Sequence, residues 1–526
     1  MSEAHLDPRT PVVVGVGQAS ERIDDPGYRA LSPVELAALA VREALNDCGA
    51  DVRQVAAAVD TIAGVRQFEI SHPYTTAPLG RSDNFPRSVA RRIGATPSQA
   101  ILEVAGGQAP QHLVTELASR IADGEAEVAV AVGAEALSTA ARLRDAEDRP
   151  DWSENVGGQL EDRGHGMDGI ISAYHITHGL TSAMAAYALF ENARRARLGL
   201  SRRQYAAAEI GELFAPFTQV AATNRHAAVP VARSAAELIT PTERNRFVAD
   251  PYTRYVVAKE KVNQAAAVLL MSVAAARRFG VPPARRVFLH GHADLRERDM
   301  LERADLGAAP ASVLAVRHAL EIANVSIGDL ATIDLYSCFP ITVSVIRDGL
   351  GLPVDDPRGL TVTGGLPFFG GPGNNYAMHA IAETVARARA APGSFGLVGA
   401  NGGFFSKYSV GIYSTTPTAW RASSDAKSQA EVDAWAAHPQ AVEADGWATI
   451  ETFTVTHRKD GARTGIVVGH LDNGRRFLAR TFPGDSQMLD ALGTDQPTGG
   501  RVYVRSSGAG NRVTMTETDM HQRHHE

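Results

Sequence analysis

The stretch Thr363–Tyr376 reads TGGLPFFGGPGNNY and is the most constrained part of the chain. It holds five glycines and two prolines around a Phe-Phe pair, and the helix-like segment AMHAIAETVARARA follows directly after it. Glycines gather where the backbone turns sharply or approaches another group closely. A helix start adds unpaired N–H groups and the positive end of the helix dipole. The stretch therefore predicts the floor of a site, although it carries few reactive side chains.

An internal repeat connects this stretch with the first half of the chain. The order Gly-Gly, helix, strand, Val-Gly-Ala runs from Gly106-Gly107 to Ala134 and again from Gly370-Gly371 to Ala400. The helical string AVREAL at 40–45 likewise recurs as AVRHAL at 315–320. Repeated order of this kind indicates duplicated structural units. We expect two similar α/β halves whose Gly-Gly helix starts face one shared centre.

Composition excludes several classes of function. The chain has 526 residues and a net charge of −7, without a basic stripe, which argues against a nucleic-acid partner or an anionic membrane surface. No run approaches the roughly 18 apolar residues of a membrane span. Two cysteines and a polar, acidic N-terminus favour a cytoplasmic protein without a disulfide framework.

The pattern along the chain predicts six regions. The first α/β half covers residues 10–138, an insertion richer in His, Arg and Asn covers 139–255, and the second half covers 256–418. An Ala/Ser-rich linker at 419–440 leads to alternating strands at 441–515, with hairpin signals at Asp460-Gly461 and Asn473-Gly474. These strands predict a small barrel of oligonucleotide/oligosaccharide-binding type, and balanced charges favour docking or ligand positioning. The tail at 516–526 is expected to be disordered.

Five motifs in order give the span from Pro11 to Thr415 a resemblance to the thiolase superfamily. They are PYTRYVVAKEKVNQAAAVLLMS at 251–272, GGQAPQHLVTELASRIADGEAEVAVAVGAEALS at 106–138, IDLYSCF at 333–339, GGLPFFGGPGN at 364–374 and GANGG at 399–403. The chain looks like a thiolase-like protein with an additional C-terminal domain, of the kind often labelled acetyl-CoA acetyltransferase-like. The resemblance implies an α/β thiolase fold: two repeated halves in αβαβα layers, a loop-domain insertion, and here a small all-β domain.

The same resemblance places glycine at each catalytic position of the family. The nucleophilic cysteine falls at Gly107, the histidine at Gly371 and the acid/base cysteine at Gly399. Thiolase chemistry needs a thiolate, a base and donors for two oxyanions, and glycine supplies no side chain for these roles. Tyr336 and Cys338 stand in the fourth motif and, with Tyr376, are the candidate catalytic residues. Cys338 is expected to be an inert thiol rather than a reactive one, because motif cysteines at apolar strand ends are usually inert, and Cys48 is a packing position. We expect no ordinary thiolase catalysis.

Without the catalytic side chains, the resemblance implies a ligand-binding role in lipid metabolism. CoA or acyl-CoA is the expected ligand, with no further cofactor, and the expected state is a monomer or a thiolase-type homodimer. The arginines at 194, 195 and 197 are expected to form a solvated helix face, or else to contact the nucleotide. The residues expected to bind the ligand are Gln108, His165, Met167, Tyr336, Asn374 and Asn401.

Two alternatives and a metal question remain open at this point. The chain also resembles thiolase-like aldolases that cleave CoA esters with two tyrosines, of which Tyr336 matches one, Gly371 replaces the other, and Tyr376 lies five residues further on. A non-standard acyltransferase is a related reading, and a non-enzymatic interaction protein is the other alternative. His175 with His178, and His290 with His292, have spacings that could ligate zinc but lack a third ligand nearby, so no metal is expected.

Overall fold

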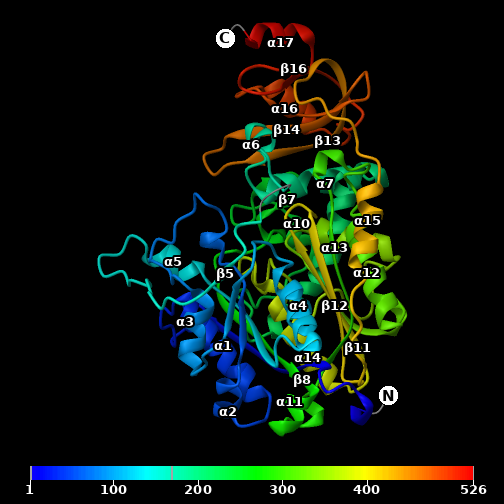
Figure 1. Cartoon of the computed structure of the whole chain (residues 1–526). Helices are drawn as coiled ribbons and strands as arrows, with labels where there is room; N and C mark the ends of the chain where they lie inside the picture. Colours follow the sequence, from blue (N-terminus) through cyan, green and yellow to red (C-terminus); the bar gives the residue numbers. More distant parts are fainter. Residues whose placement is uncertain (1–2, 167–169, 525–526) are drawn as a thin grey trace.

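The computed structural model describes residues 3–166 and 170–524 (Figure 1). The chain forms an elongated molecule with two sheets in its larger part and a small barrel at one end. The N-terminus lies at the end opposite the barrel, and the C-terminus lies beyond the barrel. None of the helices within the described ranges combines the length and the apolar character that crossing a membrane would require.

The first sheet has six strands in the order β1-β8-β4-β2-β3-β5. β2, β3, β4 and β5 run parallel, whereas β8 pairs antiparallel with both β1 and β4. β8 follows the insertion in sequence, so the sheet order places this strand with the first half although it lies after residue 256. The bounds are β1 Pro11–Glu21, β2 Thr61–Gly64, β3 Gln99–Leu102, β4 Val128–Ala136, β5 Glu161–Asp162 and β8 Asn263–Ser272.

The second sheet has four strands in the order β10-β11-β12-β9. β10 and β11 are parallel, and β12 is antiparallel to both β11 and β9. The bounds are β9 Phe288–Arg296, β10 Leu330–Leu335, β11 Phe395–Gly402 and β12 Lys407–Ser414.

Helices separate and cover the two sheets, which gives the expected αβαβα layers. α4 (Ala109–Asp123) and α14 (Tyr376–Ala390) pack on each other and on strands of both sheets, so they form the middle layer. α1 (Pro33–Asp47) covers the outer face of the first sheet, and α12 (Pro310–Ala323) covers that of the second. The remaining helices of the two halves are α2 Val52–Ala57, α3 Phe85–Ile93, α11 Val273–Arg278 and α13 Pro340–Leu350.

The repeated helical strings occupy equivalent places and make equivalent contacts. A Cβ on Gly15 of β1 would overlap the carbonyl oxygen of Ala44, the fifth residue of AVREAL. A Cβ on Gly291 of β9 would overlap the carbonyl oxygen of Ala319, the fifth residue of AVRHAL. Helix and strand therefore approach backbone to backbone in both halves, which is a physical reason for glycine in each strand.

The insertion is mostly helical and ends in a short hairpin. Its elements are α5 Leu137–Leu143, α6 Ala173–Thr177, α7 Ala183–Leu198, α8 Arg202–Tyr205, α9 Glu212–Thr223, α10 Ala235–Ile239, β6 Phe247–Ala249 and β7 Tyr252–Thr253. A π-helical turn at Ala206–Gly211 joins α8 to α9. Ser201 and Gln204 form a capping box at the start of α8.

The C-terminal strands close into a five-stranded barrel, as predicted. The order is β14-β15-β17-β16-β13, and β13 returns to pair with β14. A register shift between Ile450 and Thr452 accompanies the double pairing of β13, and Gly461 and Gly474 turn the two hairpins with φ of 87° and 80°. The bounds are β13 Asp445–His457, β14 Arg463–Leu471, β15 Arg476–Thr481, α16 Ser486–Leu492, β16 Arg501–Arg505 and β17 Arg512–Thr514.

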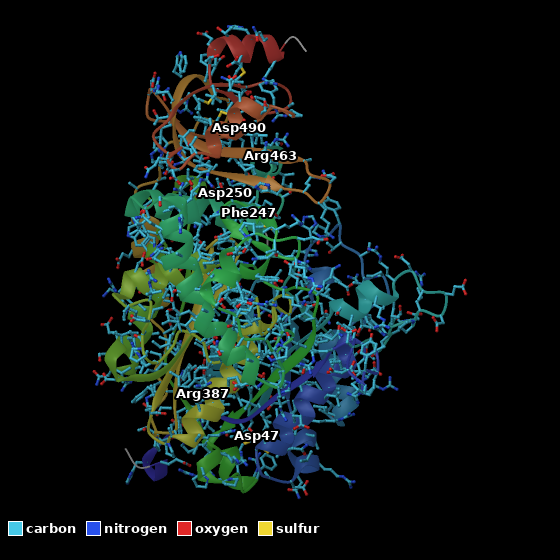
Figure 2. All side chains as sticks on the ribbon, turned by 180° about the vertical axis from the view of Figure 1, so that it is seen from behind. Asp47, Phe247, Asp250, Arg387, Arg463 and Asp490 are labelled. Atoms are coloured by element: carbon cyan, nitrogen blue, oxygen red, sulfur yellow. The ribbon has the colours of Figure 1, made fainter. Side chains whose placement is uncertain are left out.

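The barrel is joined to the insertion by backbone and by buried side chains. β6 pairs with β13 at Ala249 and Thr456, and Asn192 of α7 donates from Nδ2 to the carbonyl oxygens of Asp250 and Phe453, both at 2.9 Å. Figure 2 shows Asp250 beside the barrel, on which Arg463 lies. These bonds fix the barrel on the larger part of the molecule.

The segments on either side of the barrel contain helices. α15 (Asp425–Ala434) lies within the predicted linker and packs on β9 and α12. The prediction of a disordered tail is wrong over α17 (Glu517–His524), where the backbone N–H of Asp519 bonds the Thr516 hydroxyl at 3.1 Å and Met520 is fully buried. A capped helix with a buried apolar anchor replaces the expected disorder.

Candidate functional site

The two Gly-Gly turns meet at a cavity of about 1090 Å³. Asn374, from the second turn, accepts a hydrogen bond at Oδ1 from the backbone N–H of Gly106 in the first turn, at 3.0 Å. Its Nδ2 donates to the carbonyl oxygen of Arg66 and to the hydroxyl of Ser71, both at 2.8 Å. The shared centre predicted from the repeat is therefore present. The lining comes mainly from 68–76, 105–107, 170–171, 181–187, 257–260, 336–339, 371–374 and 401–404.

Gly107 borders the cavity but has no room for a side chain. A Cβ there would overlap the hydroxyl and Cζ of Tyr336 and would lie 2.5 Å from the carbonyl oxygen of Asn401. The Tyr336 phenol therefore takes the space that a cysteine side chain at Gly107 would need.

The other two glycines of the predicted catalytic set have contrasting surroundings. A Cβ on Gly371 would meet Leu366 at 3.4 Å and Ala258 at 3.5 Å, which is ordinary van der Waals contact. A Cβ on Gly399 would overlap the Tyr408 hydroxyl, and Gly399 is not among the described residues that line the cavity. Of the three positions, only Gly371 borders the cavity with space for a side chain.

Tyr336 presents its hydroxyl to the cavity. The residue is 7% exposed, and within the described ranges no protein group hydrogen-bonds this hydroxyl. Burial, followed by the nearby Cys338 and Glu260, raises the pKa of Tyr336 well above its usual value. The phenol therefore remains protonated and can donate a hydrogen bond.

Tyr376 does not join Tyr336 in the cavity. Its ring packs edge-on against the Tyr336 ring with centroids 5.5 Å apart, but the residue is fully buried. Its hydroxyl lies 2.5 Å from the Thr363 hydroxyl and 3.1 Å from Asp334 Oδ1. The candidate second tyrosine therefore points into the second half, a direction that sequence spacing could not determine.

Cys338 lines the cavity as a protonated thiol. The residue is 8% exposed, and burial, which outweighs its hydrogen bonds, raises the pKa of the thiol to about 12. Because the thiolate is the nucleophilic form, this environment disfavours covalent catalysis by Cys338.

The predicted ligand-binding residues divide between two places. Tyr336, Asn374 and Asn401 line the cavity, whereas Gln108 lines a neighbouring pocket of about 320 Å³. His165 accepts from the backbone N–H of Ala105 through its carbonyl oxygen, at 3.2 Å, and its side chain is not part of the described lining. The expectation for Met167 lies outside the described residues.

Sequence reasoning missed two carboxyl groups and a tyrosine of the cavity. Glu69 and Glu260 line it, and burial raises the pKa of both. Tyr187 of α7 donates from its hydroxyl to the carbonyl oxygen of Gly403 and accepts from Asn401 Nδ2, both at 2.6 Å. A signal for Glu260 was available, because it lies in the quoted 251–272 motif, but Glu69 falls in a loop-rich segment without a recognisable pattern.

The cavity has an apolar border that reaches solvent. Phe68, Tyr74 and Ile176 line it and are 43%, 88% and 49% exposed. Exposed apolar side chains around a concave site are typical of ligand-binding surfaces.

The arginines of α7 have structural partners. Arg194 and Arg195 are buried, so the expected solvated face is wrong for these two residues. Arg194 bonds Asp348 and Glu209 at 2.7 and 2.8 Å, and Arg195 donates to the carbonyl oxygen of Asp495 at 2.7 Å. Burial with these partners leaves neither arginine available to a nucleotide.

The histidine pairs also bond to protein groups. His178 lies 2.7 Å from the Tyr174 carbonyl oxygen and accepts from the Asn511 N–H, while His175 bonds Ser172. His290 and His292 lie 2.8 and 3.0 Å from the carbonyl oxygens of Thr416 and Arg421. These bonds favour structural roles for all four histidines.

Within residues 3–166 and 170–524, one group of side chains has metal-ligating chemistry. Glu103, His112 and Glu116 bring ligand-type atoms within 4.8 Å of one another. Arg163 lies 2.6 Å from both carboxylates, so a guanidinium already supplies the positive charge there.

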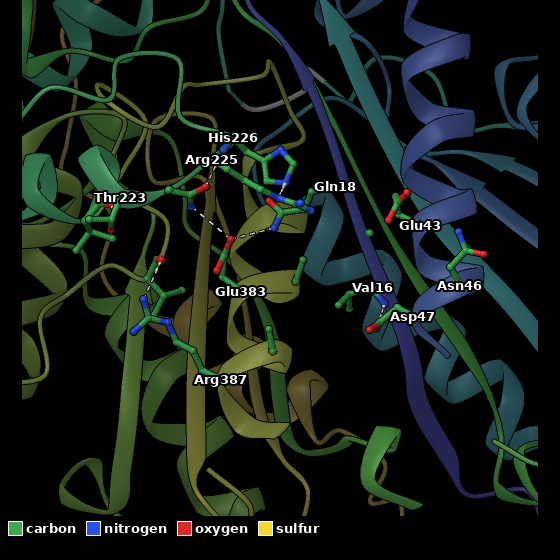
Figure 3. Close-up of a pocket in the computed structure, with 16 residues that line it drawn as sticks. Val16, Gln18, Glu43, Asn46, Asp47, Thr223, Arg225, His226, Glu383 and Arg387 are labelled. Carbon is green, nitrogen blue, oxygen red and sulfur yellow. Dashed lines mark hydrogen bonds between the residues drawn. The ribbon is translucent and has the colours of Figure 1, made fainter. Parts of the chain in front are cut away.

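A second concave surface lies between the first half and α9 and α14 (Figure 3). This groove of about 690 Å³ is polar, and its side chains bond one another. Glu383 accepts from Gln18 Nε2 at 3.0 Å and from Asn224 Nδ2 at 3.3 Å, and Arg387 donates to the Val362 carbonyl oxygen at 3.3 Å. The central cavity, with its unpartnered hydroxyl, is the stronger candidate site.

Comparisons with known proteins agree with this architecture. Residues 428–509 match the family described as the thiolase-like protein type 1 additional C-terminal domain. A crystal structure of a monomeric SCP2-thiolase-like protein type 1 from Mycobacterium smegmatis is 48% identical, with a TM-score of 0.84, over 97% of this chain and 100% of its own. Comparison with curated proteins gives no match.

More distant structures share the fold alone. An Ltp2-ChsH2(DUF35) aldolase is 20% identical with a TM-score of 0.56 over 77% of this chain and 98% of its own. Human mitochondrial 3-ketoacyl-CoA thiolase is 15% identical with a TM-score of 0.54 over 78% of this chain and 100% of its own. The predicted thiolase fold is confirmed. The 48% identity to the Mycobacterium smegmatis protein, over nearly the whole length of both chains, shows that this chain belongs to the SCP2-thiolase-like proteins of type 1.

Proposed function

We propose that this protein binds CoA or an acyl-CoA in lipid metabolism and lacks ordinary acetyl-CoA acetyltransferase catalysis. The observation that carries the proposal is the cavity of about 1090 Å³ at the meeting point of the two Gly-Gly turns. Tyr336 occupies the space that a side chain at Gly107 would need, while the rest of the cavity is open. The site is thus suited to holding a ligand without attacking it.

The chemistry of the lining supports the absence of acyl transfer. Forming an acyl-enzyme requires an activated nucleophile. Gly107 and Gly371 have no side chain, and the Cys338 thiol has a pKa raised to about 12 by burial. Thiolysis of acetoacetyl-CoA is therefore expected to be undetectable.

The distribution of apolar and charged groups suggests how the ligand lies. Among the described residues of the lining none is Lys or Arg, whereas Phe68, Tyr74 and Ile176 form an apolar border. The acyl chain and pantetheine arm suit this interior, and the phosphates would remain outside the mouth, where water solvates them.

Calorimetric titration with CoA and with octanoyl-CoA tests binding. Gly371→Phe is expected to weaken binding about 10-fold or more, because a ring on Gly371 would project into the cavity. Gly328→Phe is the matched control, since a Cβ on Gly328 likewise meets only an ordinary contact, with Ser326 Oγ at 3.6 Å, but this glycine is exposed in a short 3-10 helix. An absence of heat and of thermal shift with both ligands would refute the proposal, as would equal affinity in both variants.

A second candidate is an aldolase, or another non-standard acyltransferase, acting on a CoA ester. Its support is the unpartnered Tyr336 hydroxyl in the cavity. Tyr376 is buried against Asp334 and does not offer the second phenol. Tyr336→Phe is expected to abolish any such turnover, and a CoA-ester activity that persists in Tyr336→Phe would remove this candidate.

We further propose a monomeric, cytoplasmic protein without a nucleic-acid partner. The monomeric relative supports a single-chain state. Two unpaired buried cysteines support a cytoplasmic location, and the negative net charge argues against a nucleic-acid partner. Light scattering coupled to size exclusion is expected to give the mass of one chain, and a dimer mass would correct this. A purely non-enzymatic interaction role is the remaining alternative, and a cavity of about 1090 Å³ that side chains leave unfilled argues against it.

A further inference from the structure

The cavity contains carboxyl groups that lack a basic partner in its lining. Glu69 and Glu260 line the cavity, and the described lining includes neither Lys nor Arg. Behind them Glu135 is 2% exposed, and its Oε1 accepts from the backbone N–H of Phe68 at 2.7 Å. Burial raises the pKa of Glu135 well above its usual value, and the charges of Glu69 and Glu260 raise it further.

Glu260 is held on a segment that is bonded to both turns bordering the cavity. The backbone N–H of Ala258 donates to the carbonyl oxygen of Cys338, and the N–H of Gly371 donates to that of Lys259, both at 2.9 Å. The backbone of Glu260 therefore lies next to Gly371, because the carbonyl group of the preceding residue, Lys259, accepts the Gly371 N–H. Glu260 and Tyr336 both line this cavity, and the charge of Glu260, after burial and Cys338, adds to the raised pKa of Tyr336.

These two side chains have complementary proton chemistry. Burial raises the pKa of Glu260 above its usual value, which makes its carboxylate a stronger base. Tyr336 is more than nine-tenths buried, faces the cavity and has no hydrogen-bond partner among the described residues. A base and a neutral donor thus share one apolar cavity, the arrangement that enolisation of a carbonyl compound requires.

We propose that Glu260 and Tyr336 form an acid–base site that enolises a thioester at the carbon next to its carbonyl group. The proposal rests on the proposed function for its ligand class, an acyl thioester.

The step consumes no co-reactant. The C2–H bond breaks, its proton passes to a carboxylate oxygen of Glu260, and its electron pair forms the C1–C2 double bond. The carbonyl π pair moves to the oxygen, which accepts a hydrogen bond from the Tyr336 hydroxyl. The proton on Glu260 exchanges with water, and its return to C2 regenerates the thioester with the C–S bond intact. The observable result is exchange of the C2 hydrogens with solvent.

Deuterium exchange tests this site. The protein in D₂O is incubated with octanoyl-CoA and, separately, with the octanoyl thioester of N-acetylcysteamine, and mass spectrometry measures deuterium at C2. The wild type is expected to exceed buffer alone, and Glu260→Gln to lower the rate about 100-fold. Tyr336→Phe is expected to lower it as well. Glu321→Gln, at an exposed glutamate of α12, is the matched control and is expected to leave the rate unchanged.

The two thioesters separate this proposal from the proposed function. Exchange of the short thioester without calorimetric CoA binding would refute CoA binding and leave the acid–base site standing. CoA binding with no exchange above buffer for either thioester would refute the acid–base site alone. Unchanged exchange in Glu260→Gln, with a wild-type melting curve, would also refute it.

Discussion

The two Gly-Gly turns have the same place in their repeats but different surroundings. Gly106 and Gly370 both have positive φ, of 143° and 126°, so each turn begins with a conformation that glycine favours. At the next residue the turns diverge. A side chain at Gly107 is blocked by Tyr336 and the Asn401 backbone, whereas a Cβ on Gly371 would meet Leu366 and Ala258 only in ordinary van der Waals contact. Duplicated backbone therefore does not imply duplicated chemistry, because the neighbouring side chains decide what each turn can do.

The strongest test of this contrast is Gly107→Ala. We expect the free energy of unfolding to fall by about 3 kcal/mol or more, because the new Cβ must displace both a ring and a carbonyl group. Urea unfolding measures the change. Gly107→Ala combined with Tyr336→Ala should regain only part of the loss, because the Asn401 oxygen still lies 2.5 Å from the Cβ. A decrease in the free energy of unfolding of less than about 1 kcal/mol would contradict the lack of space for a side chain at Gly107.

Acid should weaken the first half through the ion network on α4. Burial acts to raise the pKa of Glu116, but the hydrogen bond and charge of Arg163 outweigh it and lower this pKa to about 2. The folded-state pKa is thus below the unfolded value, so the stabilisation is present above about pH 4.5 and is lost as the pH falls towards 2.

Urea unfolding between pH 6 and pH 2.5 measures this effect, which amounts to at most about 3 kcal/mol. Glu116→Gln should be less stable than the wild type at pH 6, and the difference should shrink on acidification. A difference independent of pH would show that the Glu116 charge does not stabilise this half.

Asn374→Ala breaks the direct bond between the two turns. The free energy of unfolding should fall by about 2 kcal/mol, because Gly106 N–H and the Arg66 carbonyl oxygen lose their partner. Asn374→Asp keeps an acceptor for Gly106 but loses both donated bonds, so an intermediate loss is expected. Equal stability of all three proteins would mean that the turns are held together by other contacts.

Gly371→Ala should have the smallest effect. Its Cβ meets only ordinary contacts with Leu366 and Ala258, and the φ of Gly371 is not in the left-handed region. A change within about 1 kcal/mol is expected from thermal or urea unfolding. A loss as large as that of Gly107→Ala would remove the contrast between the turns.

Much of the fold could be predicted from local patterns. The repeated strings at 40–45 and 315–320 identified two equivalent helices, and the Asp-Gly and Asn-Gly pairs located the barrel hairpins. Sequence order did not reveal that β8 enters the first sheet, because strand pairing depends on non-local contacts. The tail helix was missed because its anchor is a single buried residue, Met520.

For the candidate site, the sequence predicted which chain segments border the cavity but not where most of their side chains point. The glycines at 107 and 371 and the polar residues Asn374 and Asn401 could be placed by the motifs. The direction of Tyr376, towards Asp334, depends on the buried partner in another strand. Glu69 could not be found, since nothing in a loop sequence shows that the loop borders a cavity.

The pairing of β6 with β13 has a consequence for biosynthesis. Ala249 meets Thr456, a separation of 207 residues, so β6 must wait about 10 to 40 s for its partner at typical translation rates. Tyr174, next to the cavity-lining Ile176, likewise bonds the later Leu478 backbone. The cavity border is therefore completed by strands that leave the ribosome late, and a nascent chain stalled before them would expose apolar surface to chaperones.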